Sequence, residues 1–325
     1  MVVVGSYGLA RAIARAVAER GAKVVVSARG RDALQGAVDD VEAAGSQAHA
    51  VEGDLADPGM PERIVEEAVA RFGRIDTVVA SNLVTVYSEV DRLEPDELAR
   101  VFAVNFFGRV RLFRAALPDL RATRGTYIDV NSALAYRGIP LQAAYCSTKA
   151  AMRTLLESAR VELEKERAGV DICVVLPGAI NTPQFDRARQ KMGLQPQPVP
   201  PIYEPEPFAE AVAHCCERPV RELPIGWGAQ KLLWGQKLSP RAGDLVLLRN
   251  GWKGQHTNEP KPKGSPDNLF DTLPGDPGAH GRFDGRSRGS TAWTWLRLRR
   301  GRVGTGLALG TMGLLAARSG RFPTR

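Results

Sequence analysis

Short apolar runs alternate with longer stretches of helical periodicity over the first two thirds of the chain. Such runs are too short for globular helices and are typical of buried strands; they occupy residues 2–4, 24–27, 48–52, 77–80, 126–131 and 172–176. Between them, apolar residues recur at helical spacing over residues 9–20, 31–44, 61–72, 95–117 and 142–166. A glycine, which suits the position just after a helix, follows the first three of these stretches. The alternation predicts an α/β fold with a Rossmann-like, doubly wound parallel sheet.

The regular pattern fades beyond Arg218, so we expect one catalytic domain over residues 1–218. Residues 219–290 are rich in Pro and Gly, which predicts a largely irregular extension. Residues 291–325 form a basic and aromatic, then apolar, C-terminal segment, so the chain is expected to end in a poorly structured tail.

The C-terminal segment holds an uncharged stretch, residues 303–317, beside Trp293 and Trp295. It is shorter than the roughly 20 residues needed to span a bilayer. Its composition suits an interfacial membrane anchor. A helix that packs within the molecule or a dimer, and a disordered segment, are the alternatives.

Charge is spread unevenly along the chain, which has 325 residues and a formal net charge of +8. Residues 221–325 hold 18 Lys and Arg against 7 Asp and Glu, whereas the first 220 residues hold 26 against 29. A basic tail is either a solvated segment or a surface that attracts anionic lipid or nucleic acid. No aromatic and basic RNA-binding pattern accompanies the charge, so we expect no nucleic-acid partner.

The four cysteines show neither a disulfide framework nor metal-ligand spacing. A basic leader before the first apolar run is also missing. We therefore expect a cytoplasmic protein without a metal site, with peripheral membrane contact through the C-terminal segment as the alternative.

Candidate chemistry centres on Tyr145 and Lys149, which are four residues apart in a predicted helix. At this spacing the two side chains share one helix face, so the ammonium group can lower the pKa of the phenol and still reach a bound cofactor. Ser132 follows an apolar run, at the strand edge where open α/β sheets bind ligands. A chance pair on an amphipathic helix is the alternative reading of Tyr145 and Lys149 alone.

Asn105, Ser132, Tyr145 and Lys149, followed by Leu-Pro-Gly-Ala-Ile-Asn-Thr-Pro at residues 176–183, resemble the short-chain dehydrogenase/reductase family of the Tyr-x-x-x-Lys type. The resemblance implies an NAD(P)-dependent oxidoreductase that moves hydride between the cofactor and a small carbonyl or alcohol substrate. It implies that Tyr145 transfers the proton, Lys149 lowers its pKa and holds the ribose, and Ser132 orients the carbonyl. Asn105 would position a helix kink and a water. A homo-oligomer is expected.

The first predicted strand leads into a glycine turn, Gly5-Ser6-Tyr7-Gly8, which opens a helix. A dinucleotide's pyrophosphate would meet the helix N-terminal amides there. The turn departs from the family pattern Thr-Gly-x-x-x-Gly-x-Gly, because Ala10 stands at the third glycine. Packing of strand against helix is the alternative explanation of these glycines.

Arg29 follows the second predicted strand, where an acidic residue would pair with the ribose hydroxyl of NAD. Ala28 stands at that position, so we expect NADP as the cofactor, with NAD as the alternative. Arginines that are merely solvated at a helix start would give the same pattern.

The resemblance also implies cofactor contacts by Asp54, Leu55, Asn82 and a later group, Pro177, Gly178 and Thr182. Asp54 is equally suited to a turn or a helix cap. Asn82 lies in Ser-Asn-Leu, a departure from the family's Asn-Asn-Ala-Gly. These departures favour the rival hypothesis of a catalytically silent Rossmann-like binding or scaffold protein, tethered to a membrane in one version, whereas the four catalytic positions argue against it.

A proline-rich segment follows residue 183 and surrounds Met192, Ile202 and Tyr203. We expect it to be a lid and specificity loop over the substrate. A plain extended linker is the alternative.

Overall fold

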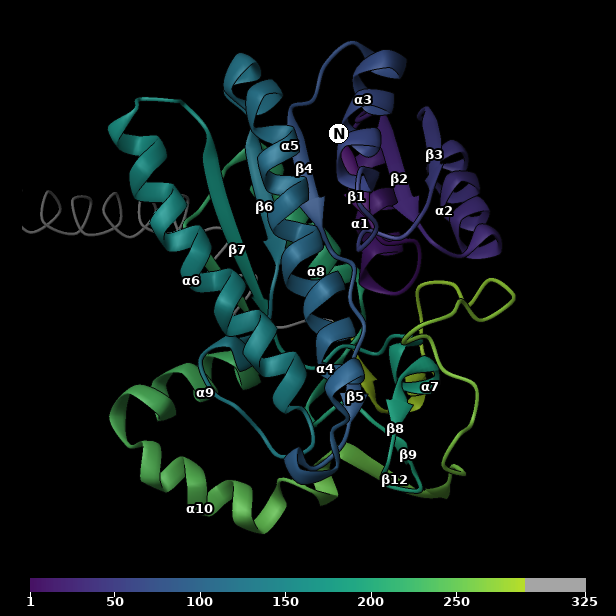
Figure 1. The fold of residues 1–325 in the computed structure, drawn as a ribbon, viewed down its shortest axis with the longest axis vertical. Coiled ribbons are helices and arrows are strands. Elements are labelled where there is room, and N and C mark those ends of the chain that lie inside the picture. Colours follow the sequence, from purple (N-terminus) through teal and green to yellow (C-terminus); the bar gives the residue numbers. More distant parts are fainter. Residues whose placement is uncertain (290–325) are drawn as a thin grey trace, which may run out of the picture.

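The computed structural model describes residues 1–289, and its centre is a parallel sheet of seven strands (Figure 1). The strand order is β11-β7-β6-β4-β1-β2-β3. The strands are β1 (Val2–Val4), β2 (Val24–Ala28), β3 (Ala48–Glu52), β4 (Thr77–Ala80), β6 (Thr126–Val130), β7 (Asp171–Pro177) and β11 (Glu222–Ile225). The order reverses between β1 and β4, and such a switch point is where doubly wound sheets bind ligands. The predicted Rossmann-like α/β fold is confirmed.

Helices cover both faces of the sheet (Figure 1). One layer contains α1 (Leu9–Ala18), α2 (Arg31–Ala43) and α8 (Glu206–Glu217), and the other contains α3 (Met60–Phe72), α5 (Gly108–Thr123) and α6 (Ala143–Lys165). The strands carry Val and Ile on both faces because both faces are buried. Gly21, Gly45 and Gly73 have φ near +80°, the left-handed conformation expected after a helix.

The helix predicted over residues 95–117 is interrupted. It comprises α4 (Pro95–Phe102), a π-helical turn over Ala103–Phe107, and α5. Asn105 lies in that turn, and its side chain forms hydrogen bonds with backbone groups outside the helix. Wide turns of this kind often mark functional positions in a helix.

The extension expected to be largely irregular also contains regular elements. It contributes β11 to the central sheet and two helices, α9 (Trp227–Leu238) and α10 (Pro240–Asn250). Sequence reasoning missed β11 because it has only four residues, Glu-Leu-Pro-Ile, and one is a proline. A proline is tolerated here because β11 is an edge strand.

Short pairings tie the remaining segments together. They involve β5 (Val86–Tyr87) with β8 (Arg189–Gln190), β9 (Leu194–Pro196) with β12 (His256–Pro260), and β10 (Ile202–Tyr203) with β13 (Ser287–Arg288). A short helix, α7 (Gln184–Arg187), precedes β8. The chain after α10 is thereby joined to the body of the domain.

The predicted membrane anchor around residues 293–317 lies outside the described residues. Within residues 1–289, no helix is long and apolar enough to cross a bilayer. The homo-oligomer and the peripheral membrane contact stay predictions.

Candidate functional site

A cavity of about 490 Å³ lies at the C-terminal ends of the sheet strands. The loops that follow β1, β2, β3, β4, β6 and β7 all contribute to its wall. Most of the predicted site residues line it: Gly5, Ser6, Gly8, Arg29, Asp54, Leu55, Asn82, Ser132, Tyr145, Pro177, Gly178 and Thr182. Asn105 and Lys149 lie behind the wall. Residues as far apart in the sequence as Gly5 and Thr182 thus meet in one place because parallel strands end at one edge.

Tyr145 and Ser132 occupy the wall of this cavity near the start of α6. Burial raises the pKa of Tyr145 to about 12, and a hydrogen bond with the Ser132 side chain opposes that rise. The Ser132 hydroxyl also accepts a 3.1 Å hydrogen bond from the Leu134 amide, which fixes its direction. The phenol is therefore protonated at neutral pH and is placed to donate a proton into the cavity.

Lys149 is 1% exposed, and its Nζ donates a 2.8 Å hydrogen bond to the Val130 carbonyl. Its Nζ lies 5.5 Å from the centre of the Tyr145 ring. Burial, with the nearby positive charge of Arg109 next in size, holds the pKa of Lys149 well below its usual range, while Asp129 opposes the shift. The sequence predicted that Lys149 lowers the pKa of Tyr145, but burial raises that pKa, and the opposing contributions come from Ser132 and Arg109.

Arg109 and Asp129 form an ion pair that sequence reasoning missed. Arg109 Nη1 lies 2.6 Å from Asp129 Oδ1, and neither side chain is exposed. The same Nη1 donates to the Val130 carbonyl at 3.0 Å, and Nη2 donates to the Asn82 carbonyl. An acidic residue in the middle of an otherwise apolar run was the available signal, since a buried carboxylate requires a partner.

Asn105 holds the loop after β4. Its Oδ1 accepts from the Val84 amide at 2.9 Å, and its Nδ2 donates to the Val84 carbonyl at 2.8 Å. The neighbouring Asn82 donates from Nδ2 to the Val104 carbonyl at 3.2 Å, and its Oδ1 is buried without a partner. Asn82 thus has one unpaired acceptor and is also a residue of the cavity wall.

The glycine turn after β1 is shaped for a close backbone approach. Gly5 has φ +122°, and a Cβ atom on it would lie 2.7 Å from the Cβ of Ala10. Gly8 has φ +60°, and a Cβ there would lie 3.1 Å from Thr182. A side chain at either position would strain the backbone and crowd the loop. The turn leads directly into α1, and its residues line the cavity at the N-terminal end of that helix.

Arg29 and Asp54 lie together at the ends of β2 and β3, with 3.5 Å between Arg29 Nη1 and Asp54 Oδ2. Asp54 Oδ1 accepts from the Ala56 amide at 2.9 Å, as the turn interpretation of this residue expects. Its other oxygen pairs with Arg100. Arg29 is half-buried rather than solvated at a helix start, and its guanidinium donates to two backbone carbonyls of the C-terminal extension.

The other end of the cavity is largely apolar, although Gln197 and Asn250 also line it. Its walls come from α9, α10, the loop after β6 and residues 197–201 of the proline-rich segment. The charged side chains that line the cavity are Arg29, Asp54 and Arg187. Arg29 and Asp54 are at the β2–β3 end, and the guanidinium of Arg187 lies 5.7 Å from the ring centre of Tyr7 in the glycine turn. The half of the cavity beyond Tyr145 therefore carries no charged side chain among the described residues.

The fold and this arrangement define the class of oxidoreductases that bind a nicotinamide dinucleotide in a Rossmann-like domain. The sequence model of the short chain dehydrogenase family matches residues 1–193. An uncharacterized oxidoreductase, YxnA of Bacillus subtilis, is 34% identical over 275 residues, which cover 83% of this chain and 77% of that protein. The chain belongs to the short-chain dehydrogenase family, and it is an NAD(P)-dependent oxidoreductase acting on CH–OH or C=O groups.

Two further proteins are similar in sequence or structure. The versicolorin reductase stcU of Emericella nidulans is 32% identical over 186 residues, covering 57% of this chain and 70% of that protein. An alcohol dehydrogenase from the archaeon Thermococcus sibiricus, complexed with 5-hydroxy-NADP, superimposes with a TM-score of 0.61. It is 27% identical, and the match covers 69% of this chain and 94% of that one. The rival hypothesis of a catalytically silent scaffold is not favoured.

The residues present fit a nicotinamide dinucleotide. Gly5 and Gly8 leave room for close approach, and the unpaired Oδ1 of Asn82 offers an acceptor.

Proposed function

We propose that this protein moves hydride between NADP(H) and the carbonyl or alcohol carbon of a small, uncharged and largely apolar molecule. The observation that carries the proposal is one continuous cavity. It joins the glycine turn and Arg29 at one end to Ser132 and Tyr145 in its middle and to a largely apolar wall beyond. A cofactor and a substrate bound there would meet at the Tyr145 hydroxyl.

The bound nicotinamide supplies or accepts the hydride. Tyr145 donates the proton to the carbonyl oxygen during reduction, because its raised pKa keeps the hydroxyl protonated. Ser132 holds that oxygen through a hydrogen bond, with its own hydroxyl positioned by the Leu134 amide. The positive charge of Arg109 lowers the pKa of Tyr145 and so favours the phenolate that remains after the transfer.

The preference for NADP rests on Arg29. Its guanidinium lines the cavity at the end of β2, and Ala28 leaves no carboxylate at the position that would hold the ribose hydroxyl of NAD. A charge-assisted contact with the 2′-phosphate contributes about 1.5–3 kcal/mol. In support, the similar Thermococcus sibiricus enzyme is complexed with a derivative of NADP.

Titration of the purified protein with NADPH and NADH, followed by nicotinamide fluorescence, tests the proposal. The wild-type protein should bind NADPH more tightly, and Arg29→Ala should remove most of that difference. The ratio of the two dissociation constants is the readout, because a general disturbance of the site would weaken both cofactors equally.

Arg31→Ala is the matched control. Arg31 is exposed, pairs with Glu52 at 3.0 Å and does not line the cavity, so its loss should leave the ratio unchanged. A wild-type preference for NADH would overturn the NADP assignment, and binding of neither cofactor would overturn the proposed function.

A further inference from the structure

Part of the C-terminal extension crosses the cofactor end of the cavity. We call residues 267–278 the strap. Arg29 Nη2 donates to the Asn268 carbonyl at 2.6 Å, and Nη1 donates to the Phe270 carbonyl at 2.9 Å. The Gly8 amide, at the start of α1, donates to the Gly278 carbonyl at 2.9 Å. The strap therefore touches the cavity wall at both the glycine turn and the β2 loop.

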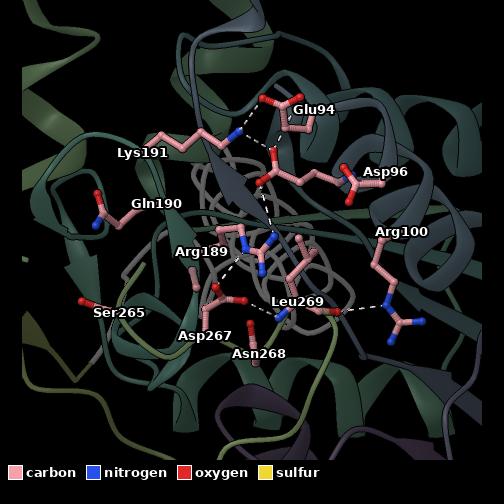
Figure 2. Close-up of polar contacts among 12 residues, drawn as sticks. Glu94, Asp96, Arg100, Arg189, Gln190, Lys191, Ser265, Asp267, Asn268 and Leu269 are labelled. Carbon is pink, nitrogen blue, oxygen red and sulfur yellow. Dashed lines mark hydrogen bonds and ion pairs between the residues drawn. The ribbon is translucent and has the colours of Figure 1, made fainter. Parts of the chain in front are cut away.

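A second set of contacts anchors the strap from outside the cavity (Figure 2). Arg189 Nε pairs with Asp267 Oδ2 at 2.8 Å, and Arg100 Nε donates to the Leu269 carbonyl at 2.9 Å. Arg100 and Asp267 do not line the cavity. These anchors can hold the strap whether or not a ligand uses the donors of Arg29 and Gly8.

Similar outer anchors fix the far part of the strap. Arg11 Nη1 donates to Asp276 Oδ1 at 2.6 Å, and the Gly275 amide donates to Asp32 Oδ2 at 2.8 Å. These contacts bind the strap to α1 and α2, again without a cavity-lining side chain.

The strap is also packed into the domain. Leu269 is fully buried in a cluster with Val84, Val101 and Val104, and Asn268 is 4% exposed. A segment that buries a leucine and is held by ion pairs at both ends is part of the fold rather than a loose tail.

Two buried side-chain amide atoms, one in the strap and one next to it, have no partner. Asn268 Nδ2 donates to Tyr7 Oη at 2.7 Å, and Tyr7 Oη donates to Gln184 Oε1 at 3.1 Å. This leaves Asn268 Oδ1 and Gln184 Nε2 unpaired, and both residues line the cavity. Leaving a buried polar atom unpaired costs about 1–3 kcal/mol. Two such atoms next to the glycine turn indicate that a polar ligand completes them.

We propose that the strap is the outer wall of the cofactor site, and that Asn268 and Gln184 bind the dinucleotide beneath it. The inference rests on the proposed function. The side-chain nitrogen of Gln184, Nε2, suits an oxygen of the diphosphate. The side-chain oxygen of Asn268, Oδ1, suits a ribose hydroxyl. The outer anchors stay in place when the cofactor binds, while Arg29 and Gly8 exchange strap carbonyls for phosphate oxygens.

Binding constants of paired variants test the role of Asn268. Asn268→Ala should weaken the binding of NADPH about tenfold, as expected for one lost hydrogen bond to a charged or buried partner. Asn258→Ala is the matched control, because Asn258 is exposed on the same extension and does not line the cavity. It should bind NADPH as the wild type does. Equal dissociation constants for both variants and the wild type would overturn the inference.

Hydrogen exchange of the wild-type protein provides a test that needs no variant. The Asn268 and Gly275 amides, which donate to Arg187 and Asp32, should exchange more slowly when NADPH is added, because the strap closes over the ligand. Faster exchange would mean that the cofactor displaces the strap, and the inference would then fail. Failure to bind either NADPH or NADH would instead overturn the proposed function.

Discussion

Arg109 and Lys149 share one acceptor, the carbonyl of Val130, at 3.0 Å from Arg109 Nη1 and 2.8 Å from Lys149 Nζ. Two basic side chains thus meet at one buried backbone oxygen behind Tyr145. Asp129, which precedes Val130 in the chain, is the one carboxylate that pairs with Arg109 among residues 1–289. Arg109 lowers and Asp129 raises the pKa of both Tyr145 and Lys149, so this ion pair acts on both candidate catalytic side chains.

Removing one partner of the buried pair should be costly. Asp129→Asn leaves the Arg109 guanidinium buried without a counter-charge, which destabilises a protein by about 3–5 kcal/mol. We expect the free energy of unfolding, measured in urea, to fall by roughly that amount. Replacing both residues by apolar ones of similar size should cost much less, because no charge is then left unpaired.

The exposed pair of Arg74 and Asp76 is the control for this experiment. Its two charged atoms also lie 2.6 Å apart, but both side chains are more than half exposed. Asp76→Asn should change the free energy of unfolding by at most about 1 kcal/mol, since solvent screens the pair. An equal loss in the two single variants would contradict the importance of burial.

We expect the buried Lys149 to lower the stability of the folded protein. Burial lowers its pKa, so charging this lysine is harder in the folded than in the unfolded protein. Lys149→Met should therefore raise the melting temperature while it abolishes turnover and weakens cofactor binding. A lower melting temperature would contradict this explanation.

The pH dependence follows from the same shift. The unfolded lysine titrates at about 10.4, and the folded one at a lower pH. At a pH above the pKa of the unfolded state, Lys149 is neutral in both the folded and the unfolded protein, so its burial does not require a proton to be lost. As the pH falls toward the folded pKa, the unfolded state binds more protons, so the wild type loses stability relative to Lys149→Met. The difference in melting temperature between the two proteins should therefore shrink as the pH rises toward about 10.

Much of the fold could be predicted because its signals are local. Glycines after helices and short apolar runs each report on a few neighbouring residues, and the six predicted strands all lie in the sheet. What could not be predicted depends on contacts between distant residues. The edge strand β11 is too short to have a pattern of its own, and the strap residue Asn268 meets Tyr7 only because the chain returns across the cavity.

The same distinction applies to the site. Motif spacing singled out Tyr145 and Ser132, which the structure brings to one cavity wall. The pKa of Tyr145 depends on how deeply the ring is buried, and spacing along a helix carries no information on that. Arg109 was missed because α5 contains several arginines. The sequence alone does not distinguish the buried one from the others.

Tyr145→Phe should remove nearly all turnover and leave the affinity for NADPH largely unchanged, because only the proton-donating hydroxyl is lost. Tyr136→Phe is the matched control. The Tyr136 hydroxyl donates to Glu222 Oε2 at 2.7 Å and does not line the cavity. Single-turnover rates of both variants check the prediction, and substantial activity in Tyr145→Phe would exclude it as the acid.

The uncharged half of the cavity should select its substrate by excluding charge. Leu232 on α9 lines this half, and Leu232→Asp would place a carboxylate where the substrate loses its water. We expect kcat/KM for an apolar test ketone to fall at least tenfold, with the dissociation constant of NADPH unchanged, since discrimination in apolar pockets amounts to about 1–3 kcal/mol.

Leu248→Asp is the control, because Leu248 on the neighbouring helix is 64% exposed and lies outside the cavity. Steady-state kinetics with the ketone and with a carboxylate-bearing analogue distinguish the outcomes. If wild type and Leu232→Asp handle the two substrates alike, the apolar half of the cavity does not hold the substrate.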